Sequence, residues 1–147
     1  MNAWLFKSEP DDYSLDDLRA AGLVRWDSIR NYGARNHLRA CRPGDLVLFY
    51  HSGRKPGIVG TARIASLPYP DPTQFDESSD YHDPGSNPDE PRWVAVDIEY
   101  AATLDEPIPL ATLKRDLPEM AVVKRQRLSV SPVTLTELQA LFPSGEF

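Results

Sequence analysis

The sequence predicts an α+β fold: a small, mixed and partly open β-barrel of about five to six strands with short helices at its periphery. Strand-like and helical segments follow one another without the regular alternation that is typical of a doubly wound sheet. The length of 147 residues is that of one ordinary domain, so we expect a single domain over residues 1–147. The longest unbroken apolar run is the five residues 46–50, whereas a membrane-spanning helix needs about 20.

The N-terminal segments carry clear boundary signals. Residues 3–7 begin with four apolar residues and predict a short buried strand, which residues 8–12 (SEPDD) break. Ser14 is the expected N-cap of a helix of about two turns. Asp16 and Asp17 follow in its first turn, where carboxylates interact favourably with the helix dipole, and Gly22 ends it.

A second helix is expected at residues 31–41, after a connector at residues 26–30. Ala34, Leu38 and Cys41 are spaced to form its buried stripe. Polar and basic residues repeat on another face at spacings of four, four and three, which makes the helix amphipathic with a basic edge; they are Asn31, Arg35, Arg39 and Arg42.

The remainder of the chain predicts more strands, two short helices and one long loop. Leu46–His51 reads as a strand that is buried on both sides, and residues 58–67 are expected to pair with it as a hairpin. Residues 68–91 hold six prolines and seven acidic residues, and a loop of that length is usually functional or mobile. The later segments are a strand at 92–100, a helix at 110–116, a strand at 127–133 and a helix through 142 that a capping box of Thr134 and Glu137 opens.

Charge is unevenly distributed along the chain. The net charge is −6, which argues against a protein that coats nucleic acid nonspecifically. Residues 19–63, however, contain nine basic and two acidic residues and carry +7, while the remainder carries −13. This division favours one electropositive face suited to phosphate, although the same charges could simply be solvated without any partner.

The common catalytic and metal-binding patterns are absent from the sequence. Residues 53–57 lack the spacing of a phosphate-binding glycine-rich loop. His82 lies between Asp80 and Asp83, but the segment matches neither a calcium loop nor a zinc site. Cys41 follows His37 by four residues, yet it also completes an apolar stripe, so a buried structural cysteine is favoured. We therefore expect no metal and no cofactor.

The remaining signal is a set of aromatic and polar residues near the arginines. Aromatic faces stack on bases, short amides and hydroxyls read base edges, and arginines hold phosphates. For Trp26, a place in a pocket and a place in the core are equally compatible with the sequence. Phe49, Trp4 and Trp93 fit the core better, and Tyr32 could cap its helix.

Several motifs in a fixed order resemble the EVE domain family over nearly the whole chain. They are residues 4–10 (WLFKSEP), 26–36 (WDSIRNYGARN), 49–52 (FYHS), 57–60 (GIVG), 69–73 (YPDPT), 92–94 (RWV) and 127–130 (RLSV). The resemblance implies a PUA-like fold, related to the YTH and ASCH domains, and a role in binding modified nucleobases. Two positions depart from the family pattern: Gly33 stands where glutamine is expected, and Ser28 stands where glycine is common.

By this resemblance, eleven residues would surround the ligand cleft: Lys7, Ser8, Glu9, Trp26, Asn31, Tyr32, Arg35, Asn36, Tyr50, His51 and Ser52. Beside them, flanking phosphates would be bound by Arg30, Arg39 and Arg42. The expected function is that of a non-catalytic reader, whose partner is DNA or RNA carrying a modified base. We expect no membrane association, favour a monomer, and expect a cytoplasmic location, or a nuclear one in a eukaryote.

Two alternatives remain open at this stage. The first is an enzyme that acts on modified nucleotides, with Glu9, Asp27 or His51 as general acid or base. The second is a protein-interaction scaffold that uses the acidic loop, which would leave the basic and aromatic residues without a role.

Overall fold

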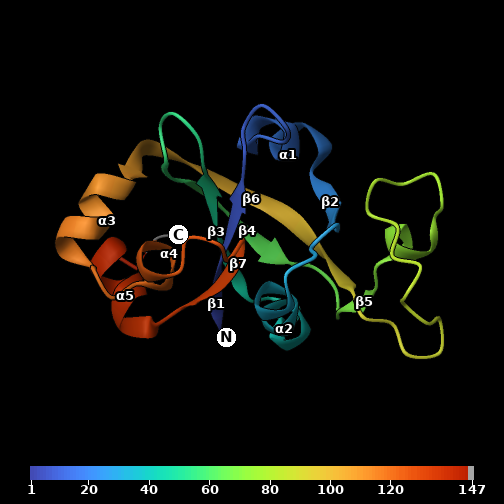
Figure 1. Ribbon diagram of the computed structural model, residues 1–147. Helices are drawn as coiled ribbons and strands as arrows, with labels where there is room; N and C mark the ends of the chain where they lie inside the picture. Colours follow the sequence, from blue (N-terminus) through green and yellow to red (C-terminus); the bar gives the residue numbers. More distant parts are fainter. Residues whose placement is uncertain (146–147) are drawn as a thin grey trace.

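The computed structural model of the protein describes residues 1–145. Within that range a seven-stranded sheet is combined with five α-helices and one 3₁₀ helix, η1 (Figure 1). In chain order the elements are β1 (Ala3–Ser8), α1 (Leu15–Ala21), β2 (Leu23–Trp26), α2 (Tyr32–Ala40), β3 (Leu46–His51), β4 (Gly57–Ile64), β5 (Tyr69–Pro70), η1 (Pro72–Phe75), β6 (Val94–Pro109), α3 (Leu110–Asp116), α4 (Ala121–Lys124), β7 (Val130–Val133) and α5 (Leu135–Leu141).

The sheet confirms the α+β class. Its strands follow the order β2-β6-β4-β3-β1-β7, and β5 pairs with the beginning of β6. Strands β1 and β3 are parallel and the other pairs are antiparallel, so the sheet is mixed. No pairing joins β2 to β7 in the part of the chain that the structure describes, and the sheet is therefore open.

Two hydrophobic clusters pack against the two faces of the sheet. On β3, Val47 and Phe49 belong to one cluster, whereas Leu46, Leu48 and Tyr50 belong to the other. Helices α1 and α2 cover the first cluster, and α3, α4 and α5 cover the second (Figure 1). The continuous apolar sequence of β3 thus has the cause inferred from the sequence, since both of its faces are buried.

The expected helix caps are confirmed. Ser14 and Asp17 form a capping box at α1, and Gly22 follows that helix with a φ of 78°, in the left-handed region that glycine adopts at little cost. Helix α2 begins one residue later than expected, and its cap is Asn31 and not Tyr32: the Asn31 side chain accepts a hydrogen bond from the Ala34 amide. The second capping box, at α5, is also present.

Some elements differ from the sequence expectation. Strands β2 and β5 were not expected, and they raise the strand number to seven. Helix α4 was not expected either. Strand β2 is a short edge strand in which Leu23 and Arg25 are exposed while Val24 and Trp26 are half-buried. Strand β6 continues to Pro109 instead of ending near residue 100. Helix α4 spans only four residues, too few to show a helical period.

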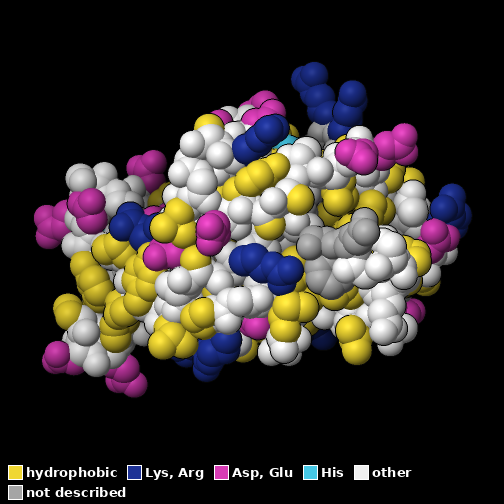
Figure 2. All heavy atoms as spheres, turned by 180° about the vertical axis from the view of Figure 1, so that it is seen from behind, with side chains coloured by type: hydrophobic (Ala, Val, Ile, Leu, Met, Phe, Trp, Pro, Cys, Tyr) yellow, Lys and Arg dark blue, Asp and Glu magenta, His cyan; other side chains and the backbone are white. Residues whose placement is uncertain are grey.

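The acidic loop, defined here as residues 68–91, is anchored by buried polar side chains. Gln74 is fully buried; its amide nitrogen donates to the carbonyls of Asp71 and Trp93, and its oxygen accepts from Ser86 Oγ. The loop stands at one end of the molecule, and from behind acidic side chains project along that edge (Figures 1 and 2). No described helix is both long enough and apolar enough to cross a membrane.

Candidate nucleic-acid site

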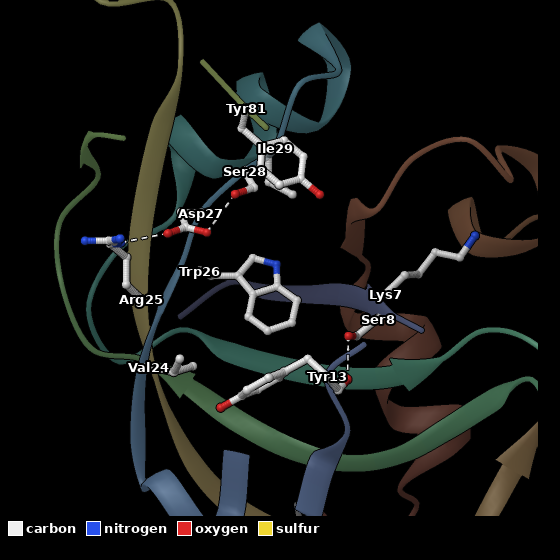
Figure 3. Close-up of a pocket in the computed structure, with 10 residues that line it drawn as sticks. All are labelled: Lys7, Ser8, Tyr13, Val24, Arg25, Trp26, Asp27, Ser28, Ile29 and Tyr81. Atoms are coloured by element: carbon white, nitrogen blue, oxygen red, sulfur yellow. Dashed lines mark hydrogen bonds and ion pairs between the residues drawn. The ribbon is translucent and has the colours of Figure 1, made fainter. Parts of the chain in front are cut away.

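A cleft of about 310 Å³ opens beside the edge strand β2 (Figure 3). The end of β1, the turn before α1, the connector that follows β2 and the acidic loop all contribute to its walls. The lining residues are Lys7, Ser8, Tyr13, Val24, Arg25, Trp26, Asp27, Ser28, Ile29 and Tyr81. Segments that are far apart in the sequence therefore meet at one concave surface.

Trp26 belongs to both the core and the cleft. Its indole packs against Phe6 and Phe49, with ring centroids 5.9 and 5.6 Å apart, and against Tyr13 at 6.0 Å. The indole also lines the open space of the cleft (Figure 3). No hydrogen bond from Trp26 Nε1 to another group is found within residues 1–145, so this donor is available to a ligand.

The connector wall is held by one buried carboxylate, that of Asp71. One of its oxygens accepts from the Ser28 amide (2.7 Å) and from Arg30 Nη1 (3.1 Å), and the other accepts from the amide and the hydroxyl of Thr73 (2.8 and 2.6 Å). Burial alone would raise the pKa of Asp71, but these hydrogen bonds outweigh it and lower the pKa. Ser28 has a φ of 66°, in the left-handed region that favours glycine.

Arg30 connects this carboxylate to Tyr81. Its guanidinium donates to the Tyr81 carbonyl from Nε and Nη2 (3.1 and 2.7 Å) and lies 5.7 Å from the Tyr81 ring. A further bond reaches Thr73 Oγ1 at 2.9 Å. Arg30 therefore fixes Tyr81 at the mouth of the cleft. Tyr81 lies in an aperiodic loop, and the sequence offered no signal for its place opposite Trp26.

Lys7 and Ser8 form the wall that comes from β1. Lys7 Nζ donates to the Gln126 carbonyl at 2.8 Å and lies 5.7 Å from the Tyr50 ring. Burial lowers the pKa of Lys7. Ser8 lines the cleft, and its Oγ donates to the carbonyl of Tyr13 at 2.6 Å, so the hydroxyl oxygen can still accept a hydrogen bond.

Four other expected site residues lie on or beside α2, outside the lining of the cleft. Asn31 serves as the N-cap, and Asn36 accepts from the Arg35 guanidinium at 2.9 Å. Tyr32 is exposed and stacks on Trp93, with a centroid separation of 4.9 Å. The guanidinium of Arg35 lies 4.7 Å from the Tyr32 ring.

The remaining expected cleft residues lie around the end of β3. Tyr50 is buried in the second core cluster, and the Ser52 amide donates to the Ser8 carbonyl. Leu15 donates its amide to His51 Nε2 at 3.0 Å; burial lowers the pKa of this imidazole, and the nearby Asp16 and Glu9 partly oppose that shift. The structure thus brings Lys7, Ser8 and Trp26 together in the cleft and places the other eight elsewhere.

Of the three proposed acid–base residues, Asp27 lines the cleft, whereas Glu9 and His51 do not. Glu9 lies close to Gly53 in the β3–β4 turn, and its other carboxylate oxygen accepts from the Asp11 amide. Asp27 lines the cleft, where it accepts from Arg25 Nε (2.8 Å) and Ser28 Oγ (2.9 Å). His51, as described above, uses its Nε2 lone pair to accept a backbone hydrogen bond.

Metal and thiol chemistry have no evident site in the described chain. No group of three or more His, Cys, Asp or Glu side chains within residues 1–145 is arranged to hold a metal ion. The thiol of Cys41 is buried and contacts the His37 carbonyl at 3.5 Å. Burial raises the pKa of that thiol to about 12, which makes it unreactive at neutral pH.

Comparisons with known proteins place this architecture in a family. The EVE domain profile matches residues 2–143. Mouse thymocyte nuclear protein 1 is 40% identical over 167 aligned residues, which cover 99% of this chain and 74% of that protein. The crystal structure of human THYN1 protein in complex with 5-methylcytosine-containing DNA has a TM-score of 0.92 and 37% identity, covering 100% of this chain and 99% of that one.

A more distant likeness extends to an ASCH protein from Zymomonas mobilis. It covers 97% of this chain and 98% of that one with a TM-score of 0.58 and 11% identity, so it shows a shared fold alone. The profile match and the relatives near 40% identity cover almost the full chain. The chain belongs to the EVE domain family.

Proposed function

We propose that this protein binds a modified base of a nucleic acid in the cleft over Trp26 and releases it unchanged. One observation carries the proposal: the Trp26 indole lines a cleft that three other chain segments enclose, and its N–H donor is unused within residues 1–145. The human THYN1 structure, whose DNA contains 5-methylcytosine, supports this assignment and makes that base the first to test. Such a role fits a nuclear location in a eukaryote and a cytoplasmic one otherwise.

The size of the cleft fits one base. Ligand sites span about 300–1,000 Å³, and the volume of about 310 Å³ lies at the lower end of that range. Sugar and phosphate would therefore remain outside the cleft. A base in a duplex must first be flipped out, at a cost of a few kcal/mol, so an unpaired strand is the simpler substrate.

The lining provides stacking, apolar contact and a few polar contacts. Trp26 and Tyr81 can stack on a base, a contribution of about 1–3 kcal/mol per base. Val24 and Ile29 offer apolar contact to a methyl substituent. The indole N–H can donate to a base acceptor, and Ser8 Oγ can accept from a base amino group.

The geometry supports binding over reaction. Of the acid–base candidates only Asp27 reaches the cleft, and its carboxylate already accepts from Arg25 and Ser28. A general acid or base needs hydrogen-bond access to the proton that it transfers. Mass spectrometry of the ligand after prolonged incubation checks this point, because a reader returns its ligand unchanged.

The test compares short single-stranded oligonucleotides that differ only in one cytosine or 5-methylcytosine. Fluorescence anisotropy of the wild type should show preference for the modified strand, and Trp26→Ala should abolish that preference. Because Trp26 also packs on Phe6 and Phe49, the exposed Tyr81→Ala variant provides a second test that spares the core.

Phe75→Ala is the matched control for Tyr81→Ala. Phe75 is an exposed aromatic residue of the same acidic loop and does not line the cleft. We expect Tyr81→Ala to weaken the preference for the modified base and Phe75→Ala to retain it. Full preference in both Trp26→Ala and Tyr81→Ala would rule out the cleft as the reading site.

A further inference from the structure

A second, polar cavity of about 400 Å³ lies between α2 and the end of the acidic loop, apart from the base cleft. Three of its lining residues are arginines: Arg35 and Arg39, one helical turn apart on α2, and Arg92. Glu90 is the one acidic side chain in the lining. The cavity therefore carries an excess of positive charge.

Two of the three guanidinium groups are not neutralised. Neither Arg35 nor Arg39 has a carboxylate within 4.0 Å in the described part of the chain. Arg92 Nη1 is paired with the Asp83 carboxylate at a distance of 3.5 Å. Burial and the neighbouring charge of Arg39 both lower the pKa of Arg35, so a bound anion would relieve an existing repulsion.

Backbone carbonyls hold these arginines in place without neutralising them. Arg35 Nη1 donates to the carbonyl of Arg92 at 3.1 Å, and Arg39 Nη2 reaches the carbonyl of Pro91 at 3.5 Å. Each guanidinium carries five N–H donors in a planar group. Arg35 also donates to Asn36 Oδ1 from Nε and Nη2, at 3.3 and 2.9 Å, so two of its donors remain for a ligand within the described chain, whereas four remain on Arg39. Phosphate, with several acceptor oxygens, matches this arrangement.

Aromatic contacts connect this cavity to the base cleft. The Trp93 ring lies 5.4 Å from the Arg30 guanidinium, which holds Tyr81 at the cleft mouth, and 5.9 Å from the Arg35 guanidinium at the cavity. Tyr32 stacks on the same Trp93 ring and is exposed. A strand that leaves the cleft mouth can thus reach the arginines by passing over Tyr32.

We propose that Arg35, Arg39 and Arg92 bind a backbone phosphate of the nucleic-acid strand whose modified base occupies the cleft. The strand as partner rests on the proposed function, whereas the anion site rests on the cavity itself. The structure favours these arginines over two others expected from the sequence to bind phosphate. Arg30 is paired with the fully buried Asp71, and neither Arg30 nor Arg42 lines the cavity.

The test measures affinity for the two oligonucleotides of the previous section over a range of salt concentrations. A phosphate contact on a single strand contributes about 0.7 to the slope of log K against log salt. Arg39→Gln should reduce the slope by about that amount. It should also weaken the binding of both oligonucleotides several-fold and to the same extent. Glu90→Gln should strengthen the binding of both oligonucleotides, because it removes the negative charge of Glu90 from the cavity lining.

Arg54→Gln is the matched control. It removes the same charge from an exposed side chain in the β3–β4 turn, at the end of β3 far from α2. A slope for Arg39→Gln equal to that of Arg54→Gln would overturn the proposal. A second result would also overturn it: inorganic phosphate stabilises the wild type but not Arg39→Gln against heat, while the salt slope for the oligonucleotides is the same in both. The cavity would then bind a free anion and not the nucleic-acid backbone.

The two proposals fail in different ways. If the wild type binds the modified and unmodified oligonucleotides equally, the base-reading function is wrong. The difference in salt slope between Arg39→Gln and Arg54→Gln still tests the phosphate site in that case. If the preference depends on Trp26 while the slopes of the two arginine variants agree, the cleft is the reading site and the phosphate site is wrong.

Discussion

The cleft wall and the arginine cavity are built from the same acidic loop, but their charges are arranged in opposite ways. At the wall, Arg30 donates to the fully buried Asp71, and the pair is enclosed by hydrogen bonds from Ser28 and Thr73. At the cavity, Arg39 is exposed, and within residues 1–145 its guanidinium makes one hydrogen bond, to the Pro91 carbonyl at 3.5 Å. At the cleft wall, charge therefore fixes the shape of the protein, whereas at the cavity it remains available to a ligand.

The largest effect is expected from Asp71→Asn. This change leaves Arg30 without its carboxylate and places an amide among donors, and breaking a buried ion pair costs about 3 kcal/mol of unfolding free energy. Urea denaturation measures the loss. We also expect weaker preference for the modified base, since Tyr81 and the connector lose their common anchor.

Asp76→Asn is the control for Asp71→Asn. Asp76 is an exposed aspartate of the same loop that accepts from the amide and hydroxyl of Ser78, much as Asp71 accepts from those of Thr73. Its replacement should leave stability and base preference close to those of the wild type. Equal losses of stability in Asp71→Asn and Asp76→Asn would show that burial of Asp71 does not make it more important than an exposed aspartate of the same loop.

Acid should weaken the wall in a way that depends on Asp71. The folded pKa of this carboxyl is lowered, so its contribution to stability is complete above roughly pH 5 and falls as the pH drops through the unfolded value of about 3.9 toward the folded pKa. The difference in unfolding free energy between wild type and Asp71→Asn should therefore narrow on acidification. A difference that is constant from pH 6 to about pH 3 would contradict the charged state of Asp71 as its source.

The comparison predicts a smaller contrast between two arginines. Arg30→Gln removes charge-assisted hydrogen bonds to Asp71 and Tyr81 and should cost about 1.5 kcal/mol. Arg39→Gln changes an exposed side chain and should alter stability by no more than about 0.5 kcal/mol. Denaturation of both variants in one buffer makes the comparison, and equal losses would contradict a division between a structural and a ligand-binding arginine.

The sequence predicted features that depend on neighbours along the chain. Caps such as Ser14 and Thr134, and the two-sided burial of β3, follow from local patterns and are confirmed. The cleft wall depends on contacts between residues 28 and 71, which are 43 positions apart, and no local pattern shows them. Strand β2 was missed because its four residues are half exposed at a sheet edge.

The candidate site shows the same limit. The motif of residues 26–36 is contiguous in sequence, yet Trp26 turns into the cleft from β2 while Tyr32 and Arg35 lie on α2 outside it. A contiguous motif is therefore divided between the cleft and the arginine cavity. Tyr81 completes the cleft from a loop that has no periodicity, so only the folded chain shows its position.

The smallest effect is expected at Ser28, a serine in the cleft wall whose φ of 66° lies in the left-handed region. A left-handed φ costs a non-glycine residue about 1–2 kcal/mol, whereas glycine adds roughly 0.5–1 kcal/mol of backbone entropy to the cost of folding. Ser28→Gly also removes the 2.9 Å hydrogen bond to Asp27. These terms nearly cancel, so the unfolding free energy should change by no more than about 0.5 kcal/mol.

A double-mutant cycle makes this small effect informative. The Ser28 amide donates to Asp71, and this bond helps to hold the left-handed backbone in place. In the Asp71→Asn background the serine loses that support, so Ser28→Gly should be more favourable there than in the wild type. Additive changes in unfolding free energy would show that the backbone of the connector keeps its conformation without Asp71. Arg30, and not Asp71, would then be the residue that holds the cleft wall in place.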